Sequence, residues 1–124
     1  MLVCSGVLAV SMPLVYGAGR ATTPGGNRWS LGNRDATLAV APWVERAQRA
    51  HANLVENLPT FAILVLVAHV TLAANELTAI GATVFFAARL AHAITYVAGI
   101  IYLRTLLFFV SIAGEALILL QLFA

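Results

Sequence analysis

The stretch that decides the fold, residues 43–74, reads WVERAQRAHANLVENLPTFAILVLVAHVTLAA. Charged and amide side chains recur as far as Asn57, and from Leu58 onward the stretch is almost entirely apolar. We predict a single helix, which at about 1.5 Å per residue would be about 45 Å long. Because the hydrocarbon core of a bilayer is only about 30 Å thick, the first turns lie outside it or line a polar cavity.

The composition of the whole chain indicates a membrane protein. Of the 124 residues, 61% are hydrophobic and only 10% are charged, and the mean hydropathy is +0.92. Soluble domains carry roughly a quarter charged residues, so this chain has too few to cover a core with a wettable surface. Its length allows one domain, most of which four spans of about 20 residues would occupy.

We therefore predict an all-α, integral membrane four-helix bundle that forms a single membrane domain over residues 1–124. The predicted spans cover residues 1–17, 43–74, 77–102 and 104–123, and Asn75-Glu76 is read as a tight turn. Residues 18–42 are rich in Gly, Pro, Asn, Thr and Arg, which is typical of a loop. No Lys or Arg precedes the first apolar run, which favours a retained span over a signal peptide.

The arginines predict the orientation. Those flanking the first connection are Arg20, Arg28, Arg34, Arg46 and Arg49. Arg104 stands at the third connection, whereas the second carries only Glu76. Because positive charge stays on the cytoplasmic side, we expect a cytoplasmic loop at 18–42 and both termini outside.

Two classes of function are not expected. The single cysteine, Cys4, cannot form an internal disulfide, and no Cys/His cluster offers a metal site, so Cys4 is interpreted as a packing residue. No basic run is long enough to suggest nucleic-acid binding.

Polar residues follow one edge of each of the last three predicted helices, at about 100° per residue. These edges comprise Arg46, Arg49, Asn53, Glu56, Asn57 and Thr60, then Arg89, His92, Tyr96 and Gly99, then Arg104, Phe108, Ser111 and Glu115. An ionisable group inside a membrane needs a partner or a water-filled cavity. We predict an ion pair between Glu56 and Arg89, within one subunit or across an interface, with a purely structural role as the alternative. His69 and Glu115 could pair near mid-membrane, or serve packing alone.

Arginines are concentrated at the cytoplasmic end of the bundle, where Arg20, Arg46, Arg49 and Arg104 are expected. Since the planar guanidinium suits carboxylates and phosphates, the predicted ligand is a small anion bearing carboxylates, bound from the cytoplasm. The alternative is an anchor to lipid headgroups, which we prefer for Arg28 and Arg34.

Residues 45–61 read ERAQRAHANLVENLPTF. This segment resembles the ERxxRAxxNxxENxPxF signature of the MAPEG family, the membrane-associated proteins of eicosanoid and glutathione metabolism. Arg89-Leu90-Ala91-His92, followed by Tyr96 and Arg104, resembles the pattern of that family's third and fourth helices. The small size and the Gly32-Asn33-Arg34-Asp35 loop are most similar to its short bacterial branch, which implies a bacterial inner membrane with the site facing the cytoplasm.

The resemblance implies a homotrimer with glutathione, as co-substrate, bound between neighbouring subunits and with no metal. It implies that the glutathione-binding residues are Arg49, Asn53, Glu56, Arg89, His92 and Tyr96. Arg104 is the catalytic candidate beside the sulfur, and Arg20, Arg46 and Thr105 are further candidates. A thiol of pKa about 8.5 is mostly protonated at neutral pH, so a nearby Arg would populate the nucleophilic thiolate. The thiolate would then attack a lipophilic electrophile or a hydroperoxide.

The sequence departs from the family pattern at a few positions. Phe108 stands where several eukaryotic members have a tyrosine, Ala52 replaces a basic residue found in some, and Thr105 supplies only a hydroxyl in place of a serine. Glutathione binding is therefore better supported than any particular reaction, transferase or peroxidase. The alternative is a non-catalytic trimeric scaffold or lipid-binding relative. A third reading, a small exporter, is disfavoured because residues 1–17 contain no acid for proton coupling.

Overall fold

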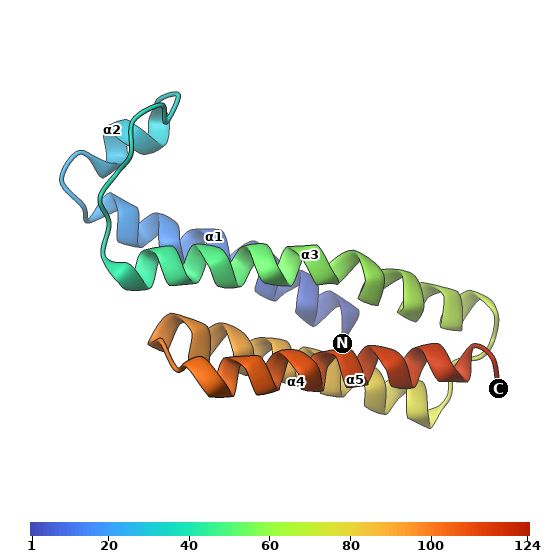
Figure 1. Cartoon of the computed structure of the whole chain (residues 1–124). Helices are drawn as coiled ribbons and strands as arrows, with labels where there is room; N and C mark the ends of the chain where they lie inside the picture. Colours follow the sequence, from blue (N-terminus) through green and yellow to red (C-terminus); the bar gives the residue numbers. More distant parts are fainter.

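The structure, a computed structural model, describes residues 1–124 and is built from helices alone (Figure 1). The helices are α1 (Leu2–Ala21), α2 (Gly26–Leu31), α3 (Pro42–Val70), α4 (Glu76–Ala98) and α5 (Ile101–Gln121). All but the short α2 are long and apolar enough to cross a membrane. The predicted all-α class with four candidate spans is thus confirmed.

Several helix ends differ from the predicted ones. The first span continues to Ala21, and the predicted loop at 18–42 contains α2. Asn75-Glu76 is not a turn by itself, because α3 stops at Val70 and residues 71–75 form the connection. Asn75 is the N-cap of α4: its Oδ1 accepts the Thr78 backbone N–H at 3.0 Å, and Thr78 Oγ1 accepts the Asn75 N–H at 2.8 Å. This capping box begins the helix at Glu76.

The α4 and α5 helices form a closely packed antiparallel hairpin, and α1 lies beside α3 (Figure 1). Small residues let α4 and α5 approach: a Cβ atom added to Gly114 would lie 2.7 Å from the Gly81 carbonyl oxygen. Phe61 of α3 stacks on Phe85 of α4, with ring centroids 3.9 Å apart, and ties the two helix pairs together. This packing fixes the relative rotation of the three helices that carry the polar edges.

The α1 helix covers only part of α3. At one end Gly19 packs directly against Trp43 and Val44, and at the other Leu2 packs against the core cluster that contains Phe61. The α3 helix continues from there to Val70, about 14 Å further. The last turns of α3 are therefore not covered by α1.

Candidate functional site

A tight turn between α4 and α5 places the first two site residues together. The Ile100 N–H donates to the Thr95 carbonyl at 2.9 Å and the Gly99 N–H donates to the Tyr96 carbonyl at 3.1 Å, which is the Schellman pattern of helix termination. Gly99 has a φ of +84°, a conformation that glycine adopts without strain. Because only two residues separate the helices, Tyr96 and Arg104 face each other across the turn.

Arg104 lies over an aromatic platform. Its guanidinium carbon is 4.5 Å from the centroid of the Tyr96 ring. The Tyr96 ring in turn packs edge to face with the His92 ring, with ring centroids 5.4 Å apart. His92 is buried, whereas Arg104 is half-buried. The Arg104 side chain has no hydrogen-bond or salt-bridge partner in the chain, so its donors are free to bind an anion.

Arg89 lies deeper between the helices and is only 1% exposed. Its Nη1 donates to Oδ1 of Asn53 on α3 at 2.7 Å. Its guanidinium carbon is sandwiched between Phe85 and Phe108, at 5.3 Å and 5.2 Å from their ring centroids. The contact with Asn53 connects α3 to the α4–α5 hairpin at the level of the site.

These side chains surround an open pocket of about 270 Å³, which we call the polar pocket. It is lined by Asn53, His92, Arg104, Thr105, Phe108 and Phe109. The pocket combines one free cation, amide and hydroxyl groups, and two aromatic rings. It could therefore hold an anionic group beside an apolar one, and no cluster of His, Cys, Asp or Glu side chains in the structure could hold a metal ion.

A family model describes the whole chain. It is that of the MAPEG family, and it matches residues 1–124. The chain belongs to the MAPEG family. It is an integral membrane protein, and its membership and apolar helices fit a glutathione-related function in the membrane. No curated protein matches this MAPEG chain.

The polar pocket of this MAPEG protein brings together four of the predicted binding and catalytic residues: Asn53, His92, Arg104 and Thr105. Tyr96 does not line the pocket, but its ring contacts two residues that do, His92 and Arg104. The other candidates do not line this pocket: Arg20, Arg46, Arg49, Glu56 and Arg89.

Three of the predicted arginines have other partners. Arg46 Nε donates to the Val97 carbonyl at 2.9 Å and so caps the C-terminus of α4. Arg49 is more than half exposed and lies 3.5 Å from Glu45, one helical turn earlier. Arg20 donates to Gln48 Oε1 at 2.6 Å. Of these, Arg46 has a clear structural role within the MAPEG chain.

The predicted ion pairs do not form within one chain. Glu56 is exposed on α3, and Arg89 bonds Asn53 in place of it. The prediction was wrong for a single subunit because the rotation of α3 points Asn53 toward α4 and Glu56 away from it. His69 and Glu115 do not pair either, since His69 is exposed near the end of α3 and Glu115 is buried within the α4–α5 hairpin.

Two aromatic residues had no place in the predicted site. Phe109 lines the polar pocket and Phe85 supports Arg89. Neither is distinguishable by sequence from the many apolar residues of its helix. The Arg89–Phe85 spacing of i to i−4 was the one available signal, because it places the two side chains on the same face.

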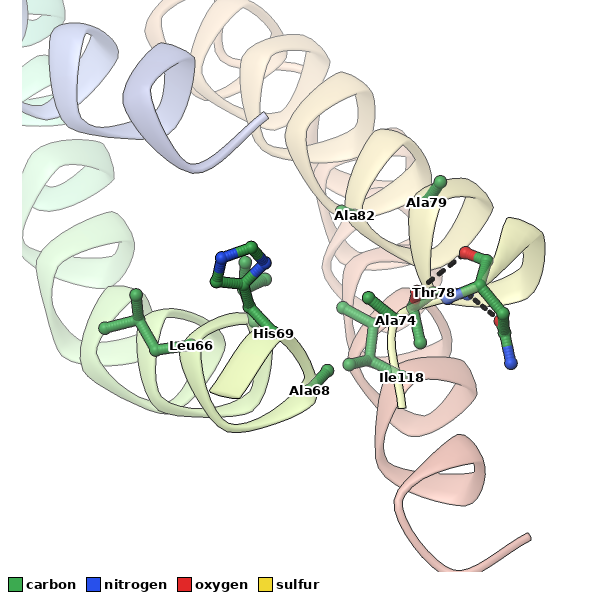
Figure 2. A pocket seen from close by; sticks show the side chains of 10 residues that line it. Leu66, Ala68, His69, Ala74, Thr78, Ala79, Ala82 and Ile118 are labelled. Carbon is green, nitrogen blue, oxygen red and sulfur yellow. Dashed lines mark hydrogen bonds between the residues drawn. The ribbon is translucent and has the colours of Figure 1, made fainter. Parts of the chain in front are cut away.

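A second cavity lies at the opposite end of the bundle, where α1 leaves α3 uncovered (Figure 2). This loop-end cavity has a volume of about 420 Å³. It is lined by Val65, Leu66, Ala68, His69, Ala74, Asn75, Thr78, Ala79, Ala82 and Ile118. Thr78 of this cavity and His92 of the polar pocket are 14 residues apart on α4, which corresponds to about 21 Å along the helix.

Proposed function

We propose that this MAPEG protein is a membrane-embedded glutathione-dependent transferase or peroxidase. The observation that carries the proposal is the free guanidinium of Arg104, held over Tyr96 at the rim of the polar pocket. Glutathione is a small anion with two carboxylates and one thiol. The amide of Asn53 and the hydroxyl of Thr105 could bind its polar groups while Arg104 lies beside the sulfur.

The chemistry follows from placing a cation next to a thiol. Arg104 favours the thiolate, because a positive charge stabilises the anionic form and the half-buried site weakens solvent screening. In the transferase reaction the sulfur bonds to the electrophilic carbon and the leaving group departs with its electron pair. In the peroxidase reaction the sulfur attacks the terminal oxygen of the hydroperoxide, the O–O bond breaks, and the alkoxide leaves and takes up a proton to give the alcohol. The thiol of a second glutathione then attacks the sulfur of the resulting sulfenic acid, which forms the disulfide and releases water. The rings of Phe108 and Phe109 offer an apolar wall for the acceptor.

The surface of α3 supports assembly into the homotrimer that the resemblance implies. One face of α3 carries three charged side chains that are exposed in the single chain: Glu45, Arg49 and Glu56. Charged side chains facing lipid are costly, so a neighbouring subunit would cover at least the deepest of them, Glu56. Such an interface would bring Arg49 and Glu56 to a glutathione molecule shared between subunits.

The proposed location is a bacterial inner membrane, with the termini outside and the polar pocket facing the cytoplasm. The α1–α3 connection and the α4–α5 turn lie at the same end of the bundle (Figure 1). Six of the seven arginines lie at or near this end: Arg20, Arg28, Arg34, Arg46, Arg49 and Arg104. Positive charge on the cytoplasmic side supports this orientation.

The direct test is conjugation of glutathione to a model electrophile by the detergent-solubilised protein. We expect Arg104→Gln to lower the maximal rate at saturating glutathione more than it lowers glutathione affinity, because the lost charge acts mainly on the thiolate. The matched control is Arg28→Gln, which removes an exposed arginine outside the polar pocket and should leave the rate unchanged. Equal rates for the two variants would refute the role of Arg104.

A second candidate function, lipid binding without turnover, is favoured by the loop-end cavity. Its walls are mostly apolar and small, and the imidazole of His69 stands among them without a hydrogen-bond partner (Figure 2). A fluorescent fatty acid should bind the wild type and be excluded by Ala79→Phe, which adds a ring to the lining. Ala98→Phe, at the other end of α4, is the control, and equal binding by all three proteins would remove this candidate.

A further inference from the structure

Two opposite charges are buried in the α4–α5 hairpin. Arg89 is 1% exposed and Glu115 is 7% exposed. Nε and Nη2 of Arg89 and Oε1 of Glu115 are the buried side-chain atoms that have no hydrogen-bond partner. The fully buried side-chain atoms that lack a partner therefore belong to one cation and one anion.

The packing of the hairpin brings these two side chains toward each other. Gly114 lies against the backbone of Phe85, where an added Cβ would be 2.8 Å from the Phe85 nitrogen, and the Phe85 ring lies under the Arg89 guanidinium. On α5, Glu115 is seven residues beyond Phe108 and so shares its face, about 10 Å further along the helix. Phe108 is the other ring that contacts Arg89. Glu115 and Arg89 thus face the same layer between the helices.

The antiparallel direction of the two helices makes both side chains lean toward each other. Long side chains on a helix lean toward its N-terminus. Because α4 and α5 are antiparallel (Figure 1), Arg89 leans toward the level of Glu115, and Glu115 leans toward the level of Arg89. Opposite charges in one layer attract each other, and the low polarity of the surroundings weakens the screening of that attraction. They do not form a direct salt bridge, since the one in the chain joins Glu45 and Arg49.

We propose that Glu115 is the counter-ion of Arg89 and that ordered water joins the two charges. A water molecule between them would satisfy the three orphaned atoms at once, as buried waters do in proteins. Each charge alone would be expensive inside a membrane bundle, and the pair is electrically neutral. The buried acid that the sequence assigned to His69 thus belongs to Arg89.

The pair gives Arg89 a positioning role in the site. Arg89 does not line the polar pocket but fixes Oδ1 of Asn53. The amide nitrogen of Asn53 is then left to donate toward the pocket, where a ligand carboxylate could accept it. This part of the inference rests on the proposed function: Asn53 contacts glutathione, and Arg89 with Glu115 orients Asn53.

A double-mutant cycle tests the pair on the full-length protein in detergent, with thermal unfolding as the readout. Glu115→Gln and Arg89→Gln should each lower the unfolding midpoint by about 5 °C or more, because each leaves one uncompensated buried charge. The double variant R89Q/E115Q should unfold at a higher temperature than either single variant. Glu76→Gln, which neutralises an exposed acid in the first turn of α4, is the matched control and should lower the midpoint less than Glu115→Gln does, because it loses only a favourable interaction with the helix N-terminus.

The pair is refuted if Glu115→Gln behaves like Glu76→Gln, or if the double variant is no more stable than the two singles. If one single variant does not fold, recovery of folding in the double variant supports the pair equally well. Glutathione affinity is measured separately, and Glu115→Gln should weaken it although Glu115 lies outside the polar pocket. Unchanged affinity overturns the positioning role. Failure of the wild type to bind glutathione refutes the proposed function but leaves the stability cycle as a test of the pair.

Discussion

The contact between Gly81 and Gly114 sets the register of the α4–α5 hairpin and hence the positions of Arg89, Phe108 and Arg104. In Gly114→Ala the new Cβ would lie 2.7 Å from the Gly81 oxygen and 2.8 Å from the Phe85 nitrogen. Both neighbours are backbone atoms, which cannot rotate away as a side chain can. Reaching an ordinary contact of 3.4 Å requires the helices to separate by about 0.7 Å.

Overpacking of this kind costs about 1 to 3 kcal/mol, from which the higher helix propensity of alanine recovers about 0.5 to 1 kcal/mol. We expect Gly114→Ala to lose about 1 to 2 kcal/mol of unfolding free energy, or about 3 to 10 °C in the midpoint. Circular dichroism of the protein in detergent measures this change. Gly6→Ala is the control, because a Cβ there has nothing within 4 Å and should be neutral or slightly stabilising. If the two variants unfold at the same temperature, the close α4–α5 approach is wrong.

Substitutions at three further positions test the local geometry of the site and of the helix ends. Tyr96→Leu removes the ring under Arg104 and should weaken glutathione binding by about two- to fivefold, whereas Tyr96→Phe keeps the ring and should bind nearly as the wild type does. Gly99→Ala forces a side chain into a left-handed conformation and should lower the unfolding free energy by about 1 to 2 kcal/mol in thermal melts. Asn75→Ala leaves the Thr78 N–H without its cap and should cost about 1 kcal/mol by the same measurement; an unchanged midpoint would contradict the capping box.

The apolar runs predicted the helices because hydrophobic length is a direct consequence of bilayer thickness. Helix ends were less predictable. The end of α4 depends on the positive φ of Gly99, and its beginning on reciprocal hydrogen bonds between Asn75 and Thr78. Hydropathy does not show whether such local interactions are strong enough to end a helix at a given residue. The pairing of Arg49 with Glu45, in contrast, follows from their i, i+4 spacing and was predictable.

The residues of the site were predictable as a group but not as pairs. Helical spacing placed Asn53, Arg89 and His92 on the polar edges, and the structure brings these edges together. Spacing along one helix does not determine how far a neighbouring helix is rotated or displaced. For that reason the sequence predicts Glu56 as the acid near Arg89, whereas in the structure Glu56 is exposed and Glu115 is the acid buried in the α4–α5 hairpin.

The proposed function requires that glutathione binds in the polar pocket beside Arg104. Isothermal titration calorimetry of the detergent-solubilised wild type with millimolar glutathione tests it most directly. We expect a saturable heat of binding that weakens when the pocket residue Asn53 is changed to Ala and persists in Arg28→Gln. The absence of any binding heat in the wild type would contradict the claim.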